Sequence, residues 1–212
     1  MSPLYAIVDV DVCAASGRAP EAVAAAFLRA GVSHVQIRAK HLASGAFLEL
    51  VTAVVPAARA AGATLLVNDR VDVARSAGVG VHLGQEDLPV AEARRLLGPA
   101  AVIGRSTHTA SELAAALAEP VTYVAYGPVF ATRTKANPDP VVGLDGIHAA
   151  AAAAGAAGVP LVAIGGITLA TARAVTAAGA QAVAIISDLL AEGADPEARA
   201  RRFLSALAVN PV

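Results

Sequence analysis

The sequence predicts a single (β/α)8 TIM barrel domain of the α/β class. Short apolar runs rich in β-branched residues recur along the chain, and alanine-rich helical stretches separate them. Most of these runs are continuously apolar, which is typical of parallel strands covered by helices. Eight such units fit into 212 residues without a linker, so we expect residues 1–212 to form one barrel. A doubly wound open sheet is the alternative, but no GxGxxG turn follows the first strand.

The expected strands lie roughly one βα unit apart along the chain. In order, we expect them at Leu4–Val8, His34–Arg38, Thr64–Asn68, Gly80–Leu83, Val102–Arg105, Tyr123–Tyr126, Leu161–Ile164 and Ala182–Ile186. Between them, Pro20-Glu21 and Ser111-Glu112 indicate helix starts. Glycines indicate helix ends, at Gly31, Gly62, Gly98 and Gly179.

The composition indicates a soluble protein of the cytoplasm. Hydrophobic residues make up 56% of the chain, charged residues 16%, and the formal net charge is −1, so we expect no nucleic-acid partner. The N-terminus lacks the basic start of a signal peptide. The uncharged stretch Ala149–Ile167 is rich in alanine and broken by glycine and proline, which favours a helix and a buried strand over a membrane span.

Two further features limit the kind of site and assembly. Cys13 is the single cysteine, so an intrachain disulfide and a cysteine-rich metal site are excluded. Alanine-rich outer helices leave modest apolar faces, which are compatible with a monomer or a homodimer. With nucleic acid and membrane set aside as partners, we expect the protein to bind small-molecule substrates.

Polar residues follow four of the expected strands, where a barrel builds its active site. Lys40 and Lys135, the two lysines among 16 basic residues, both come just after strands. The four segments are Gln36–Lys40, which includes Arg38, Asn68–Arg70, Gly84–Asp87 and Thr132–Lys135. Basic side chains with carboxylates between them suit a polyanion carried on a divalent metal. The alternative is a set of structural salt bridges, such as Asp69–Arg70 or Asp72–Arg75.

A second anion site is expected across the barrel mouth. Gly165-Gly166 follows the seventh strand, and Ile186-Ser187 ends the eighth. Loops after these strands often bind phosphate through backbone N–H groups, and glycine permits close approach. The alternative is that the glycines make a tight turn before the next helix.

Other polar residues give weaker signals. His82 is interpreted as a hydrogen-bonded core histidine rather than a base. Ser106 has no nucleophile-elbow context, so a hydrolase triad is not expected. Tyr123 and Tyr126 are interpreted as packing residues, although Tyr126 could face a ring-shaped substrate.

Taken together, the motifs resemble those of the thiamine-phosphate synthase (thiamine-phosphate pyrophosphorylase) family. They lie, in order, at Leu4-Tyr5, Gln36–Lys40, Val67–Ala74, Val81–Pro89, Ile103–His108, Tyr126–Lys135 and Ala163–Ile167. The resemblance runs from about Leu4 to Ser187. It implies a transferase that joins hydroxymethylpyrimidine diphosphate to thiazole phosphate, forms thiamine phosphate and releases diphosphate.

The resemblance also implies a role for each matching residue. The pyrimidine diphosphate would be bound by Gln36, Ile37, Arg38, Ala39, Lys40, Asn68, Ser106 and Lys135. The thiazole phosphate would be bound by Thr132, Arg133, Thr134, Gly166, Ile186 and Ser187. Mg²⁺ would be the cofactor, with Asp69 and Asp87 as its ligands. The catalytic residues would be Arg38, Lys40, Ser106 and Lys135.

The chain departs from the family pattern at two places, and two rival functions remain. Family members often have an acid where this chain has Ala39, and the first loop, Asp9–Arg18, is unusual, which leaves a lid role open. One rival is a thiazole tautomerase, a related barrel that carries a catalytic histidine where this chain has Pro128. The other is a non-catalytic sensor of thiazole phosphate.

Overall fold

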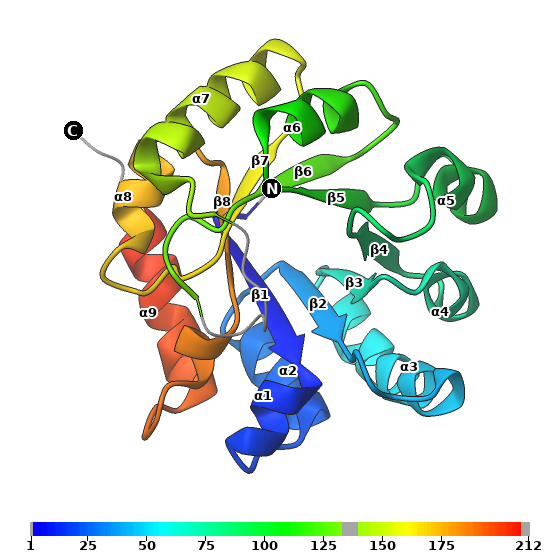
Figure 1. The fold of residues 1–212 in the computed structure, drawn as a ribbon. Coiled ribbons are helices and arrows are strands. Elements are labelled where there is room, and N and C mark those ends of the chain that lie inside the picture. The colour runs from blue at the N-terminus through cyan, green and yellow to red at the C-terminus, as the bar shows by residue number, and fades with distance from the viewer. Residues whose placement is uncertain (1, 133–139, 209–212) are drawn as a thin grey trace.

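Eight parallel strands form a closed barrel in the computed structural model, which describes residues 2–132 and 140–208 (Figure 1). Each strand pairs with the next along the chain, and β8 pairs with β1 to complete the ring. The predicted barrel is therefore confirmed, and the open-sheet alternative is wrong.

The strand bounds agree closely with those expected from the apolar runs. The strands are β1 (Leu4–Asp9), β2 (His34–Arg38), β3 (Thr64–Asn68), β4 (Gly80–Leu83), β5 (Ile103–Thr107), β6 (Tyr123–Tyr126), β7 (Leu161–Ile164) and β8 (Ala182–Ile185). The main shift is in β5, which begins and ends later than expected.

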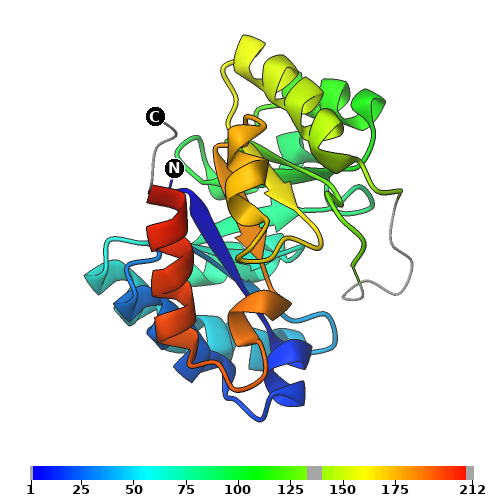
Figure 2. The same cartoon turned by 90° about the vertical axis from the view of Figure 1, so that its left-hand side faces the viewer.

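Helices cover the outside of the barrel. They are α1 (Val10–Ala15), α2 (Pro20–Arg29), α3 (Ser44–Ala60), α4 (Val71–Ala77), α5 (Val90–Leu97), α6 (Ala110–Leu117), α7 (Gly143–Ala156), α8 (Ala172–Ala177) and α9 (Pro196–Ala208), with a 3-10 turn η1 (Ser187–Leu190). The last helix, α9, packs between α2 and α8 and so joins the two ends of the ring (Figures 1 and 2). No helix in the described ranges is long and apolar enough to cross a bilayer.

The segment Asp9–Arg18, expected as a loop, contains the helix α1. The Asp9 carboxylate accepts hydrogen bonds from the backbone N–H groups of Asp11 and Val12, at 3.1 and 3.0 Å. This is the N-cap arrangement that starts a helix, and Asp9 is one of the residues that favour it. The expectation of a loop was wrong because Asp9 caps a helix directly at the end of β1.

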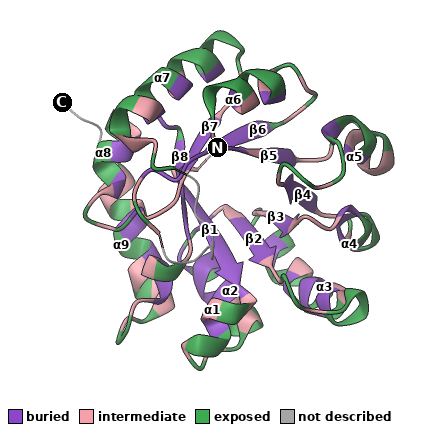
Figure 3. Cartoon of the chain, in the orientation of Figure 1, coloured by how far each residue is buried: buried purple, intermediate pink, exposed green. Residues whose placement is uncertain are grey.

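Strand alternation divides the buried side chains into two cores. One set packs inside the barrel and includes Tyr5, Leu66 and Tyr123. The larger set packs between the strands and the helices, whose buried sides face the barrel (Figure 3). Because successive strand residues point to opposite faces, every second residue at a strand end faces the barrel mouth.

Gly104 makes room for Tyr123, one of the two tyrosines inside the barrel. A Cβ atom at Gly104 would lie 2.1 Å from Cζ of Tyr123 and 2.6 Å from Nδ1 of His82. We expect Gly104→Ala to lower the free energy of unfolding by about 1–3 kcal/mol, because a buried methyl group forces its neighbours out of place. Denaturant titration measures the loss. Gly155→Ala is the control, since a Cβ at this position of α7 has nothing within 4 Å and alanine favours helix.

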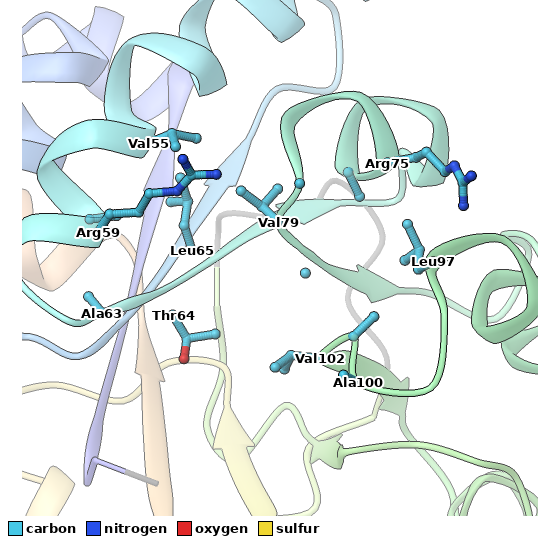
Figure 4. Close-up of a pocket in the computed structure, with 15 residues that line it drawn as sticks. Val55, Arg59, Ala63, Thr64, Leu65, Arg75, Val79, Leu97, Ala100 and Val102 are labelled. Carbon is cyan, nitrogen blue, oxygen red and sulfur yellow. The ribbon is translucent and has the colours of Figure 1, made fainter.

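A hollow of about 430 Å³ lies at the opposite end of the barrel from the mouth, beside the starts of β3, β4 and β5. Figure 4 shows mainly small and aliphatic side chains around it, with Arg59 and Arg75 on two sides. Among the described residues, none of those predicted from the sequence to belong to the site lines this hollow. The N-terminal ends of barrel strands serve stability rather than chemistry.

Candidate active site

A cavity of about 1400 Å³ opens at the C-terminal ends of the strands. It brings together most of the site residues that were predicted from sequence. Those that line it are Gln36, Arg38, Lys40, Asn68, Asp69, Asp87, Ser106, Thr132, Gly166, Ile186 and Ser187. Segments far apart in the sequence therefore meet at one mouth.

Two predicted residues face away from this cavity. The side chain of Ile37 is buried in the core between strands and helices, and Ala39 packs against the same core. Ile37 lies between Gln36 and Arg38 on β2, so alternation turns it outward. These two residues can contact a ligand in the cavity only through their backbone. Arg133, Thr134 and Lys135 lie outside the described residues.

The two described basic residues of the first predicted segment are each paired with an acid. Arg38 Nη1 donates to Asp9 Oδ2, and Lys40 Nζ donates to Asp69 Oδ2 at 2.7 Å. Arg70 pairs with Asp72 outside the cavity. The alternative pairs Asp69–Arg70 and Asp72–Arg75 are therefore wrong, because Asp69 turns toward the cavity and Arg70 turns along α4.

Asp69 and Asp87 form a pair of neighbouring carboxyl groups. Burial raises the pKa of Asp87, and the adjacent Asp69 carboxyl raises it further. Gly84 N donates to Asp87 Oδ2 at 2.6 Å, which fixes that side chain. Asp69 has a φ of 64°, in the left-handed region that non-glycine residues rarely adopt. The strained backbone aims the Asp69 carboxyl at Asp87. Backbone strain of this kind is common at functional sites.

The charge of the cavity wall favours a bound cation. Among the described residues that line the cavity, the basic ones are Arg38 and Lys40. The acidic residues on the same wall are Asp9, Asp11, Asp69, Glu86, Asp87, Glu112 and Asp188. An excess of carboxylates repels an anionic ligand unless a metal ion offsets it. Proteins commonly hold Mg²⁺ by one or two carboxylates, so the neighbouring Asp69 and Asp87 fit the expected metal, although no group of three such ligands occurs among the described residues.

The glycine pair after β7 lies beside the loop that follows β6. Gly165 and Gly166 have φ values of 98° and 66°, and a Cβ on Gly166 would lie 2.6 Å from the carbonyl oxygen of Ala131. Phe130 N donates to Gly165 O at 3.0 Å, which joins the two loops. The glycines thus permit close packing of the loops, and Gly166 also lines the cavity next to Ser187 and Thr132.

His82 is a hydrogen-bonded histidine inside the barrel, as predicted. Its Nδ1 lies 2.8 Å from Tyr123 Oη, and its Nε2 lies 2.8 Å from Ser106 Oγ. Burial lowers the pKa of His82 to about 4, so the ring is neutral at physiological pH and is not a ready proton donor. Tyr126 packs in the outer core, so the idea that it faces a substrate ring was wrong.

The buried His82 makes stability depend on pH. The unfolded chain protonates this ring near its ordinary pKa of 6.5, whereas the folded chain does so near 4. The unfolded state therefore binds more protons between these values, and we expect the free energy of unfolding to fall as pH drops from 6.5 toward 4. The contribution of His82 is at most about 3 kcal/mol. Denaturant titrations of the wild type and His82→Gln across this range measure it, because the other titrating groups are shared. Equal pH dependence in both proteins would contradict the prediction.

Comparison with known proteins gives the family. The model of the thiamine monophosphate synthase family matches residues 4–189. A thiamine-phosphate synthase from Anaeromyxobacter dehalogenans is 48% identical over 191 residues, which cover 90% of this chain and 84% of that protein. A thiamine-phosphate synthase from Koribacter versatilis is 44% identical over 214 residues, and the match covers 96% of this chain and 95% of that protein. The chain belongs to the thiamine monophosphate synthase family.

A solved structure supports the same membership. The thiamine phosphate pyrophosphorylase from Pyrococcus furiosus superposes with a TM-score of 0.84 at 29% identity, over 96% of this chain and 94% of that one. As a member of the thiamine monophosphate synthase family, this protein is an enzyme of thiamine biosynthesis that acts on small molecules.

For this member of the thiamine monophosphate synthase family, sequence reasoning missed three residues of the site. Asp9 holds Arg38, and Tyr5 and Tyr123 lie beneath the cavity in contact with Gln36 and His82. Strand alternation offered a signal for Asp9, because Tyr5, Ile7 and Asp9 are the inward positions of β1. The tyrosine contacts depend on the barrel register, which the sequence does not show.

Proposed function

We propose that the protein joins 4-amino-2-methyl-5-(diphosphooxymethyl)pyrimidine to 4-methyl-5-(2-phosphoethyl)thiazole, giving thiamine phosphate and diphosphate. One observation carries this proposal: a single cavity combines an apolar floor, two polar rims and a carboxylate pair. Each part suits one feature of these two substrates.

The floor of the cavity suits flat heterocycles. It is formed by aliphatic side chains from four strands, namely Ile7, Ala125, Val162, Ile164 and Ala184. Such a surface favours rings and holds little water. The floor would therefore align the two rings and keep water away from the carbon that reacts.

One rim suits the pyrimidine diphosphate. Five polar residues from this part of the chain line the cavity: Gln36 and Arg38 on β2, Lys40 just after it, Asn68 on β3 and Ser106 on β5. Arg38 and Lys40 each have N–H groups beyond the one that binds an acid, and these can bind diphosphate oxygens. Lys135 is assigned to the same diphosphate by the family resemblance.

The other rim suits the phosphate of the thiazole. Gly166 and Ser187 follow β7 and β8, and Thr132 comes from the loop after β6. Backbone N–H groups after these strands commonly bind phosphate in barrels. Arg133 and Thr134 are assigned to the same phosphate by the resemblance.

Mg²⁺ is the proposed cofactor, with Asp69 and Asp87 as the residues that would hold it. The metal would supply positive charge to the departing diphosphate. The chain's own part is electrostatic as well: Arg38, Lys40 and Lys135 would stabilise negative charge on the leaving group, and Ser106 would donate a hydrogen bond.

The proposed reaction needs no protein base. The electron-rich aminopyrimidine can stabilise a positive charge on its methylene carbon, so the carbon–oxygen bond breaks before the thiazole nitrogen forms its bond. His82 fits this scheme, because burial lowers its pKa to about 4 and so makes the ring a weak base.

The test mixes purified protein with both substrates and Mg²⁺ and follows thiamine phosphate by its fluorescence after oxidation. Product that requires both substrates and disappears with EDTA is the expected result. Folded protein that gives no product would overturn the proposal. Isomerisation of a thiazole precursor would then identify a tautomerase, and tight binding of thiazole phosphate without turnover would identify a sensor.

A further inference from the structure

Five side chains from five strands form an unbroken line of hydrogen bonds across the barrel, beneath the cavity. Gln36 Nε2 donates to Tyr5 Oη at 2.8 Å, and Tyr5 Oη lies 2.9 Å from Tyr123 Oη. Tyr123 Oη lies 2.8 Å from His82 Nδ1, and His82 Nε2 lies 2.8 Å from Ser106 Oγ. We call this line the polar chain. Its two ends, Gln36 and Ser106, line the cavity, as do Tyr5 and His82, whereas Tyr123 lies below it.

The packing of the barrel fixes the middle of the polar chain. Tyr5 and Tyr123 are at most 1% exposed, and their rings meet edge to face with centroids 5.8 Å apart. His82 stacks on Tyr123 with centroids 5.6 Å apart. The stack exists only because Gly104 has no side chain, since a Cβ there would overlap Tyr123. The three central residues therefore have little freedom to change partners.

The hydrogen-bonding capacity of each group favours one direction for the polar chain. An amide nitrogen only donates, so the Tyr5 hydroxyl accepts from Gln36 and gives its own proton to Tyr123. Tyr123 then donates to His82 Nδ1. A neutral imidazole that accepts at Nδ1 carries its proton at Nε2, so His82 donates to Ser106 Oγ. In the reverse direction, the hydrogen atoms of Gln36 and Tyr5 would point at each other.

We propose that the polar chain orients the substrate through its two ends, with Tyr5, Tyr123 and His82 as positioning residues. Ser106 Oγ accepts from His82, so its hydroxyl proton is directed to a substrate group that only accepts hydrogen bonds. Gln36 uses its nitrogen for Tyr5, so its carbonyl oxygen is left to accept from a substrate amino group. This inference rests on the proposed function, which supplies such a substrate.

An aminopyrimidine diphosphate has both kinds of group. Its phosphate oxygens only accept hydrogen bonds, and its exocyclic amine donates them. A serine that rotates freely would present lone pairs as often as its proton, and lone pairs repel phosphate oxygens. The polar chain would prevent the Ser106 hydroxyl from turning its lone pairs toward the phosphate before the substrate binds.

The direction of the polar chain can be measured without substrate. Nitrogen-15 NMR of the histidine rings shows which nitrogen carries the proton, and His82→Gln identifies the His82 signal among the five histidines. We expect a neutral ring protonated at Nε2. Tyr123→Phe should shift Nδ1 because its donor is lost, whereas Tyr126→Phe, the same change at the outward position of β6, should not. A ring protonated at Nδ1 would overturn the proposed direction.

A double-mutant cycle tests whether the polar chain acts through Ser106. We expect Tyr123→Phe to lower kcat about tenfold, with no change in KM for thiazole phosphate, and Tyr126→Phe to leave kcat unchanged. In the Ser106→Ala background, Tyr123→Phe should have no further effect on kcat, because the group it orients is gone. An equal fall in both backgrounds would overturn the proposal. If the wild type forms no thiamine phosphate, the proposed function fails, and the NMR experiment still decides the direction.

Discussion

Asp69→Asn is expected to lower kcat about 10²- to 10³-fold and to leave the fold intact. The substitution keeps the shape of the side chain but removes one of the two neighbouring carboxylates that we assign to Mg²⁺. A weakly held metal no longer offsets the negative charge on the departing diphosphate, and losing one such preorganised interaction typically costs this much. Steady-state assays at increasing Mg²⁺ measure the loss. Asp72→Asn is the matched control, because Asp72 pairs with Arg70 outside the cavity.

Binding of Mg²⁺ without turnover gives a second measurement for Asp69→Asn. A ligand that binds only the folded state raises the unfolding temperature, so Mg²⁺ should stabilise the wild type and the Asp72→Asn protein. The Asp69→Asn protein should gain much less. Unchanged kcat together with unchanged Mg²⁺ dependence would mean that Asp69 is not a metal ligand.

Arg38→Met is expected to reduce both activity and stability. Arg38 is the partner of Asp9, which is 2% exposed, so the substitution leaves a buried carboxylate without its counter-charge. Breaking a buried ion pair in this way typically costs about 3–5 kcal/mol, and we expect the lower end because two backbone N–H groups still donate to Asp9. We also expect kcat/KM for the pyrimidine diphosphate to fall about 100-fold or more, because a guanidinium is lost from the diphosphate rim.

A double variant separates the two effects of Arg38. Asn at position 9 can still cap α1, so Asp9→Asn combined with Arg38→Met removes the unpaired charge and should recover most of the stability. Activity should stay low, because the guanidinium is still missing. Denaturant titration measures the stability and steady-state kinetics measures kcat/KM on the same samples, so the two effects of Arg38 can be compared directly. Recovery of activity in the double variant would show that Arg38 acts only through Asp9.

The strands and their order could be predicted from the sequence because buried parallel strands are continuous apolar runs. The Leu161–Ile164 run, for example, is β7 with the expected bounds. The C-terminal ends of such strands meet at one mouth, so the predicted residues Asn68, Ser106 and Ser187 could be placed together without a structure. The family resemblance added the identity of the proposed ligands, which geometry alone does not provide.

What could not be predicted depends on side-chain direction and register. Asp69 has a basic residue next to it in the sequence, but it has a left-handed backbone and pairs with Lys40, whereas Arg70 pairs with Asp72. Tyr5 and Tyr123 are 118 positions apart, and the ring of Tyr123 fits inside the barrel only because Gly104, its neighbour on β5, has no side chain. A single sequence shows neither the strained backbone nor which side chains the barrel register brings together.

The pairing of β1 with β8 has a consequence for the synthesis of the chain. β1 can pair with β2 early, but Leu4 meets its partner Val183 only about 180 residues later. At typical translation rates this interval lasts about 10 to 35 seconds. The outer edge of an apolar strand, Leu4–Val8, stays unpaired for that time, and such edges attract other strands. The first strand of the nascent chain therefore stays open to misassembly until β8 emerges and pairs with it.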